Sequence, residues 1–364
     1  MALTTALIGL PLVGKTTVFN LLTGSDMETS DFFSGKTETS TGMAKIPDRR
    51  MRFLSDMYKP KKTTYAEIQV SDVPGLVRGA SQGKGVGNQF LNAIRNVEIL
   101  VQVVRAFENK DIAHADDSID PLRDIETIDM ELLLADMDVV EKRIDRIKNG
   151  KKIKKEETVE LEVLQKILDG LEKETPIHSL GLTEDEKNML KHYSFLTEKP
   201  VILVINIDEG QFKAKSYPQK DALHKLAAEK NLPLIEICGK IEMEISQLPE
   251  EDKEIFVEDL GITEPGIDQL ARVAYDRLNL MPFFTSGEDE VKAWTIEKGT
   301  NAKRAAGKIH SDIERGFIRA EVVKCDDLER LGSMAKVKEN GLHKLEGKEY
   351  IVQDGDIINF RFNV

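Results

Sequence analysis

The stretch "GLPLVGKT", Gly9 to Thr16, decides the fold because it matches the phosphate-binding pattern Gly-x-x-x-x-Gly-Lys-[Ser/Thr]. A short apolar strand at residues 5–10 leads into it, and the helical pattern "TTVFNLLTG" follows as far as Gly24. Glycines let backbone N–H groups turn toward phosphate oxygens, and the N-terminal end of the helix dipole favours an anion. This strand–loop–helix context predicts a nucleoside triphosphate site.

Two residues of the loop have separate roles in this prediction. The Lys15 ammonium is expected to bridge the β- and γ-phosphates as a catalytic charge, and the Thr16 hydroxyl is expected to bind Mg²⁺. The other nucleotide-binding residues predicted in and around the loop are Gly9, Leu12, Val13, Gly14 and Thr17.

A second phosphate signal is "IQVSDVPG", in which an apolar strand ends at Asp72 and is followed by Gly75. Asp72 is placed to hold the Mg²⁺ shell through water, and the Gly75 backbone N–H can bind the γ-phosphate. Asp-x-x-Gly alone is a common turn. It indicates a nucleotide site here because it follows a phosphate loop and stands at a strand end.

Further apolar strands appear in "AEIQVSDV", "EILVQVVR", "PVILVINI" and "PLIEIC", with helical patterns between most of them. This alternation predicts an α/β fold with a mostly parallel, doubly wound sheet. We assign the nucleotide-binding domain to residues 1–123 and 197–280.

Residues 124–196 interrupt the alternation with two long amphipathic helical patterns, separated by a turn at Asn149 and Gly150. They predict an inserted antiparallel helical hairpin whose connecting segment "KNGKKIKK" is either a solvated helix end or a contact for RNA or a partner protein. Residues 281–364 contain short strands and one helix, which predict a small α+β domain suited to recognition.

The stretch "VILVINIDEG", residues 201–210, stands where a guanine-specific GTPase carries Asn-Lys-x-Asp. Guanine offers two adjacent donors, N1–H and the 2-amino group, which an aspartate accepts as a bidentate pair. Here Asn206 is present, the lysine position is Ile207, and the acid is the longer Glu209. The residues alone therefore predict relaxed base specificity. Cys238 and Gly239 in "EICGK" are expected to form a second base-contacting loop.

Several of these motifs, with others along the whole chain, carry a family resemblance. They are "GLPLVGKTT", "DVPGLVRGASQGKGVGNQFL", "VVRAFEN", "NIDE", "KAWTIEKGT", "AAGKIHSDIERGFIRAEV" and "EGKEYIVQDGDIINFRFNV", and together they resemble the YchF branch of the Obg family, the Obg-like ATPases. The resemblance implies a Ras-like P-loop NTPase domain with a coiled-coil insertion and a C-terminal β-grasp domain of the TGS type. It also implies ATP hydrolysis in preference to GTP, and association with ribosomes.

The water-positioning group for hydrolysis differs from the Ras pattern, in which a glutamine follows Asp-x-x-Gly. Leu76 stands there and has no hydrogen-bonding group. His114 is our candidate for a water-orienting or general-base role, because it follows a strand whose C-terminal end should face the nucleotide. The resemblance also implies a histidine in this segment, because members of the family carry one there.

Two positions depart from the family pattern. Relatives carry an effector-loop threonine that closes over Mg²⁺, and this chain reads "FFSGKTETSTG", with Lys36 at the corresponding position and Thr37 beside it. Thr37 is the third candidate metal ligand, after Thr16 and Asp72. Relatives also have an asparagine where this chain has Leu12, which disfavours a potassium-assisted mechanism.

Composition sets the context for these motifs. The chain of 364 residues has a formal net charge of -13 and two cysteines far apart in sequence, which fits a reducing cytoplasm and not a disulfide framework. We expect Mg²⁺ as cofactor, ATP or GTP and the ribosome or its RNA as partners, and neither a membrane nor DNA. The rival functions are a GTPase of the Obg type and a nucleotide-gated binding module with negligible turnover.

Overall fold

The structure is a computed structural model that describes residues 4–28, 39–76, 79–80, 86–109, 111–112, 114, 118–150 and 154–363. The chain forms two compact units. One comprises residues 1–42 and 69–270, and the other comprises residues 43–68 and 271–364. No helix in the described part of the chain is long and apolar enough to cross a membrane.

The first unit is built on a sheet that has six strands in the described residues, in the spatial order β2-β4-β1-β5-β6-β7. The strands are β1 (Thr4–Ile8), β2 (Ser40–Lys45), β4 (Glu67–Asp72), β5 (Ile99–Arg105), β6 (Val201–Asn206) and β7 (Leu234–Ile237). The pairs β1–β4, β1–β5, β5–β6 and β6–β7 are all parallel, so the predicted parallel sheet is confirmed. Because β4, β1, β5, β6 and β7 are parallel, their carboxyl ends meet at one edge, where open α/β sheets bind ligands.

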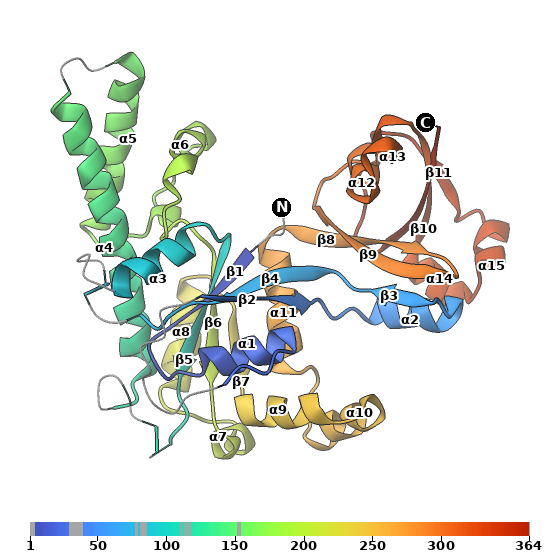
Figure 1. The fold of residues 1–364 in the computed structure, drawn as a ribbon, viewed down its shortest axis with the longest axis horizontal. Coiled ribbons are helices and arrows are strands. Elements are labelled where there is room, and N and C mark those ends of the chain that lie inside the picture. The colour runs from blue at the N-terminus through green and yellow to red at the C-terminus, as the bar shows by residue number, and fades with distance from the viewer. Residues whose placement is uncertain are drawn as a thin grey trace. The chain divides into compact units, whose positions relative to one another are not determined.

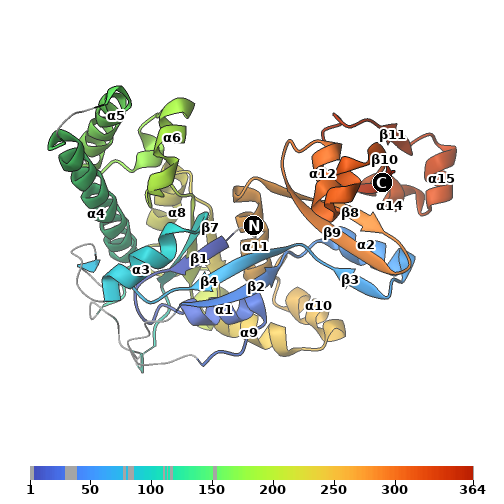
Figure 2. The same ribbon diagram turned by 45° about the horizontal axis from the view of Figure 1, so that its top comes forward.

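Helices accompany these strands as the alternating pattern predicts. They are α1 (Lys15–Thr23), α3 (Val86–Arg95), α7 (Glu209–Ala214), α8 (Lys220–Glu229), α9 (Gly239–Gln247) and α10 (Glu250–Asp259), and α11 (Gly266–Arg277) precedes the next strand. Apolar residues of α8 and α9, such as Leu223 and Ile241, pack on strand residues Leu203 and Ile205 in one buried cluster. α1 and α9 lie next to each other (Figure 2), and both begin at the carboxyl edge of the sheet.

The helical insertion contains α4 (Pro121–Lys148) and α5 (Lys155–Leu171), which run side by side (Figure 1). Their apolar stripes form one buried core, and Arg143 of α4 donates two hydrogen bonds to Glu160 of α5 at 3.0 and 2.7 Å. The predicted hairpin is confirmed. α4 begins at Pro121, where the Asp120 carboxylate caps the helix through the Arg123 N–H. The helices α6 (Glu184–Leu190), η2 (Ile177–Ser179) and η3 (Lys191–Tyr193) complete the insertion.

The second unit contains a mixed sheet with six strands in the described residues, in the order β11-β10-β12-β8-β9-β3. These strands are β3 (Lys62–Thr64), β8 (Leu280–Ser286), β9 (Glu290–Glu297), β10 (Phe317–Lys324), β11 (Lys344–Glu346) and β12 (Asp356–Phe362). Its helices are α2 (Arg49–Tyr58), α12 (Ala302–Ile309), α13 (Ser311–Arg315), α14 (Cys325–Leu331) and α15 (Met334–Glu339). α12 contributes Ala302, Ala305 and Ala306 to the core of this unit.

Residues 43–68 belong to this second unit, although we predict them from the sequence to lie in the nucleotide-binding domain. β3 pairs in parallel with β9, and Arg50 of α2 donates hydrogen bonds to Asp48 at 2.7 Å and to Asp354 at 2.9 Å. A local pattern reports that a segment is a strand or a helix but not which sheet it joins, since strand pairing is a long-range contact. The remaining domain boundaries stay a prediction.

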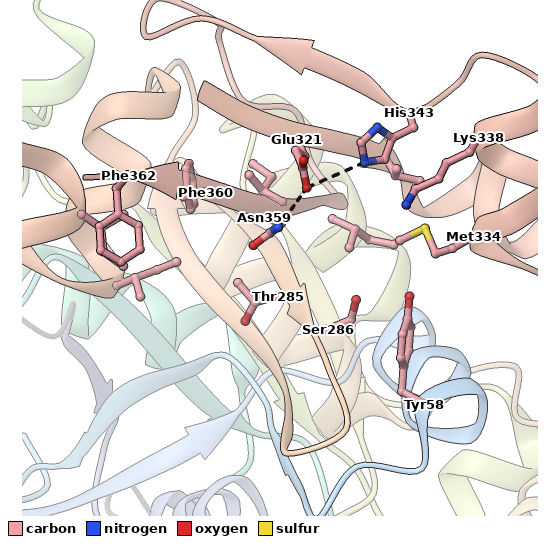
Figure 3. Close-up of a pocket in the computed structure, with 15 residues that line it drawn as sticks. Tyr58, Thr285, Ser286, Glu321, Met334, Lys338, His343, Asn359, Phe360 and Phe362 are labelled. Atoms are coloured by element: carbon pink, nitrogen blue, oxygen red, sulfur yellow. Dashed lines mark hydrogen bonds and ion pairs between the residues drawn. The ribbon is translucent and has the colours of Figure 1, made fainter. Parts of the chain in front are cut away.

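The second unit also encloses a cavity of about 460 Å³ beside β12 (Figure 3). Tyr58, Lys338 and His343 point toward it, together with Asn359. The Glu321 carboxylate accepts a hydrogen bond from the Asn359 amide at 2.9 Å and lies 3.9 Å from His343 Nε2. None of the site residues predicted from the sequence lines this cavity.

Candidate functional site

The phosphate loop follows β1, at the centre of the parallel sheet. Gly9 and Gly14 have positive φ angles of 152° and 96°, which glycine adopts without strain. A Cβ atom at position 9 would lie 2.5 Å from the Val103 carbonyl oxygen, and one at position 14 would collide with the Asn206 amide nitrogen. Both glycines of the motif are therefore required by close approach as well as by backbone conformation.

Lys15 is the first residue of α1, and its side chain is buried in the loop. The ammonium donates hydrogen bonds to the carbonyl oxygens of Gly9 at 3.2 Å and Leu10 at 2.8 Å. The loop thus holds a positive charge at the end of a helix whose dipole also favours an anion. This is the electrostatic arrangement that a triphosphate needs.

Thr16 and Asp72 meet beside this loop. The Thr16 hydroxyl donates to the Asp72 carboxylate at 2.9 Å, and Asp72 is almost completely buried. The register of the sheet explains the contact, because Leu7 of β1 lies opposite Asp72 at the end of β4. Two predicted metal ligands from distant parts of the sequence therefore lie side by side.

Gly75 and Leu76 close the same side of the loop. The Leu76 N–H donates to the Gly9 carbonyl at 3.0 Å, and a Cβ atom on Gly75 would lie 3.0 Å from Pro11. The Leu76 side chain is fully buried. It packs inward and presents no polar atom for a water molecule.

Asn206 connects the two ends of the site. From the end of β6, its amide nitrogen donates to the Val13 carbonyl at 3.1 Å and its oxygen accepts from the Gly239 N–H at 3.4 Å. Asn206 is buried, and so is Ile207, which replaces the lysine of the guanine-reading motif. The asparagine thus fixes the phosphate loop against the second loop, as its place in the motif predicts.

These residues surround a cavity of about 950 Å³. Of the nucleotide-binding and metal residues that we predict, it is lined by Leu12, Gly14, Lys15, Thr16, Thr17, Asp72, Gly75, Asn206, Glu209 and Gly239. Gly9, Val13 and Cys238 lie behind this lining and act through the backbone contacts described above or through packing. Burial raises the pKa of the Cys238 thiol. Thr37 and Lys36 lie outside the described residues.

His114 has a different environment from the rest of the predicted site. Its side chain is buried, and Nε2 lies 3.0 Å from the Asp124 carboxylate on α4. Burial raises the pKa of the Asp124 carboxyl, and the charges of His114 and Arg123 oppose that rise. Among the described residues that line the 950 Å³ cavity, His114 is absent. Its catalytic role stays a prediction.

Arg105 and Phe107 belong to the site but are not among the residues that we predict from the sequence. Arg105 is buried at the end of β5 and donates to the carbonyl oxygens of Asn109 at 3.2 Å and Ile112 at 3.1 Å. Its guanidinium lies 4.4 Å from the centre of the Phe107 ring. Phe107, Asn109 and Ile112 all line the cavity. The signal in the sequence is an arginine at the carboxyl end of a mostly apolar strand, because a buried guanidinium needs hydrogen-bond acceptors.

Comparison with known proteins identifies the family. A family model described as 50S ribosome-binding GTPase matches residues 4–136, and the model YchF-GTPase_C, described as a protein of unknown function, matches residues 280–363. The chain is 45% identical over its full length to the full-length Ribosome-binding ATPase YchF of Bacillus subtilis. It is 44% identical to that of Haemophilus influenzae, with 98% of each chain covered. The chain belongs to the YchF family.

A solved YchF structure confirms the fold class. The chain superposes on the Schizosaccharomyces pombe YchF GTPase with a TM-score of 0.85 and 32% identity, covering 99% of this chain and 98% of that one. The P-loop NTPase domain, the helical middle region and the C-terminal mixed-sheet domain are therefore those of a YchF protein. One of these relatives is named an ATPase and another a GTPase, so their names do not decide which base this chain binds.

Proposed function

We propose that this chain binds and hydrolyses ATP, and GTP more weakly, with Mg²⁺, and that it acts as a ribosome-associated switch in the cytoplasm. The contact of Thr16 with Asp72 carries the proposal, because it places a hydroxyl and a carboxylate together beside Lys15. A hydroxyl, a carboxylate and phosphate oxygens are the ligands that Mg²⁺ takes in such sites. The two relatives are named ribosome-binding ATPases, which supports the proposed association with ribosomes.

The donor set of this chain fits Mg²⁺. Both Thr16 and Asp72 offer hard oxygen atoms at 2.9 Å from each other, close enough for one to bind the ion directly and the other through water. Thr37 is proposed as a further ligand on the basis of the family resemblance alone. When bound, the ion would neutralise charge on the phosphates during transfer.

The lining of the cavity suits a purine base without selecting adenine or guanine. Phe107 and Met243 contribute an aromatic and an apolar side chain to the lining, and Asn206 already donates to Val13 and accepts from Gly239. Stacking on an aromatic ring does not distinguish purines. Discrimination must therefore come from the groups at the base edge, where Glu209 replaces the aspartate of guanine-specific proteins.

Equilibrium titration of the chain with non-hydrolysable ATP and GTP analogues tests the substrate. ATP should bind more tightly, and GTP binding that is tighter by about tenfold or more would contradict the proposal. Single-turnover hydrolysis with and without ribosomes then tests the enzyme. We expect slow hydrolysis that ribosomes accelerate.

One observation favours a binding module with negligible turnover as the second candidate. Leu76 is buried and apolar at the position where Ras-like enzymes place their water-orienting glutamine. Nucleotide that stays intact both with and without ribosomes would favour this alternative over the ATPase.

His114 is the proposed replacement for that glutamine. Nε2 of His114 lies 3.0 Å from the Asp124 carboxylate, so a buried acid orients the imidazole that we propose as the water-orienting group. We predict that His114→Ala lowers the single-turnover rate by about 10²-fold while nucleotide affinity changes little. The measurement is rapid-quench hydrolysis at saturating enzyme. An unchanged rate would remove His114 from the mechanism.

A further inference from the structure

The side chain of Glu209 is not alone at the base edge. Its Oε2 accepts a hydrogen bond from the Lys240 ammonium at 3.1 Å, and both residues line the nucleotide cavity. Glu209 is the first residue of α7, after β6, and Lys240 lies in the first turn of α9, after β7. The pair therefore joins the two loops that we expect to contact the base.

The backbone fixes the position of this lysine. Gly239, its neighbour in the chain, donates to the same Asn206 side chain that holds the phosphate loop. The Ile207 N–H donates to the Ile237 carbonyl at 2.9 Å and joins the two loops a second time. Lys240 is thus held within reach of Glu209 by groups that do not depend on the ion pair.

A lysine in the first turn of a helix is unfavourable on its own, because the N-terminal dipole repels a cation. Glu209 and Glu244 offset that repulsion, and the hydrogen bond with Glu209 is the main reason that the pKa of Lys240 is raised. The nearby Asp208 carboxylate accepts from the Gln211 and Glu108 N–H groups instead. Among the described residues that line the cavity, Lys15 serves the phosphate end and Lys240 supplies the positive charge at the other loop.

The hydrogen-bonding groups of guanine and adenine differ in how they interact with the Glu209–Lys240 pair. Guanine presents N1–H and a 2-amino group, which need a carboxylate with free lone pairs. Adenine presents an unprotonated N1, which a bare carboxylate repels and an ammonium group can satisfy. A Glu209 carboxylate that accepts from Lys240 is a weaker acceptor for guanine and repels adenine less.

We infer that Lys240 is a specificity-determining residue, and that the Glu209–Lys240 pair, not the glutamate alone, sets the preference for ATP over GTP. This inference rests on the proposed function, because it presupposes that the cavity binds a purine nucleotide. The side chains are 38% exposed for Glu209 and 69% exposed for Lys240. An exposed pair of this kind contributes little to folding, so its removal should change selectivity and leave stability nearly unaltered.

The test compares Lys240→Met, Glu209→Gln, the double variant and Lys240→Arg in full-length protein. Affinities for non-hydrolysable ATP and GTP analogues are measured by equilibrium titration at one ionic strength, and thermal unfolding checks that each variant folds. Lys240→Met exposes the carboxylate, so we expect the ratio of ATP to GTP affinity to fall by about tenfold. Lys240→Arg keeps the cation and should hold the ratio within about threefold of the wild type.

The double variant completes the cycle. If the exposed carboxylate causes the change, Glu209→Gln in the Lys240→Met background should restore most of the ratio. A ratio that Lys240→Met leaves unchanged, or that the double variant fails to restore, would overturn the inference. Failure of the proposed function looks different, because the wild type itself would then bind GTP more tightly or bind neither nucleotide.

Discussion

A comparison of Gly14 with Gly24 distinguishes two reasons why a position requires glycine, namely backbone conformation and lack of space for a side chain. Both have positive φ angles, 96° and 66°, but a Cβ atom at position 14 would collide with Asn206 whereas nothing lies within 4 Å of one at position 24. Both substitutions by alanine pay the cost of the left-handed backbone, which is about 1 kcal/mol. Only Gly14→Ala also displaces the side chain that joins the two loops of the site.

We therefore predict that Gly14→Ala weakens the binding of ATP and GTP alike by at least about tenfold, because the collision disturbs Asn206 and the phosphate loop together. Gly24→Ala is the matched control and should bind both nucleotides as the wild type does. Nucleotide titration and thermal unfolding check both variants. Equal affinities in the two variants would mean that the loop absorbs the extra methyl group.

The environment of Glu242 predicts that the free energy of unfolding depends on pH. It is buried on α9, accepts the Gly266 N–H at 2.6 Å, and burial raises its pKa to about 7. In the unfolded chain a glutamate titrates near its ordinary value, so between that value and about 7 the folded protein binds the extra proton. The contribution of Glu242 is therefore complete at low pH and is lost as the pH rises through this window.

The variant Glu242→Gln isolates this contribution, because glutamine keeps the acceptor for Gly266 and does not ionise. Relative to the wild type, we expect it to gain stability as the pH rises from about 5 to about 8, by an amount on the order of 1–3 kcal/mol. Urea unfolding at both pH values measures the difference. A difference that does not depend on pH would show that Glu242 is ionised in the folded protein.

At the scale of elements, α4 contacts two segments near the nucleotide site. Its Asp124 holds His114, and its Glu131 accepts the Gly79 N–H at 2.6 Å, just beyond Gly75 and Leu76. One helix of the insertion therefore supports both the candidate catalytic histidine and the segment after the Asp-x-x-Gly turn. A rigid helix of this length can position both at once.

We predict that Glu131→Ala lowers the single-turnover rate of ATP hydrolysis by roughly tenfold and changes ATP affinity by less than about twofold, because Glu131 positions backbone and does not touch the nucleotide cavity. Glu131→Gln keeps an acceptor and should recover most of the rate. Glu126→Ala, on the exposed face of the same helix, is the control. A loss of affinity equal to the loss of rate would argue for a general effect on folding instead.

At the scale of the whole molecule, the net charge of -13 conceals a local excess of basic residues between positions 298 and 319 of the second unit. These residues are all exposed and comprise Lys298, Lys303, Arg304, Lys308, His310, Arg315 and Arg319. Lys298 pairs with Asp276, and Arg315 pairs with Asp312 at 2.6 Å. Lys303 and Arg304 are adjacent and exposed on α12, so we take this pair as the candidate contact for a phosphate backbone.

We predict that ribosome affinity falls as salt is raised, and that Lys303→Ala with Arg304→Ala lowers the slope of log affinity against log salt by about 2. Lys336→Ala with Lys338→Ala removes the same charge from α15 and should leave the slope unchanged. Sedimentation with ribosomes at a series of salt concentrations measures both. Equal slopes in the two double variants would place the RNA contact elsewhere.

Much of the site was predictable because its signals are local. The phosphate loop, Asp72 at the end of one strand and Asn206 at the end of another are each recognisable from a short stretch of sequence. Short apolar runs identified the strands that carry them, and the parallel sheet then brings their carboxyl ends to one edge. The hairpin was also predictable, since an apolar stripe repeating at helical spacing needs a partner helix.

Other features depended on contacts between residues far apart in the chain, which no local pattern encodes. Examples are the pairing of β3 with β9 and the hydrogen bonds of Arg105 to the loop after β5. The contact of His114 with Asp124 and the hydrogen bond of Lys240 to Glu209 are further examples. The sequence by itself determined the phosphate loop and the polar residues at the strand ends, because strand ends and glycine loops are local. The tertiary structure decided which charges meet, because the partner of a side chain is set by the packing of the whole fold.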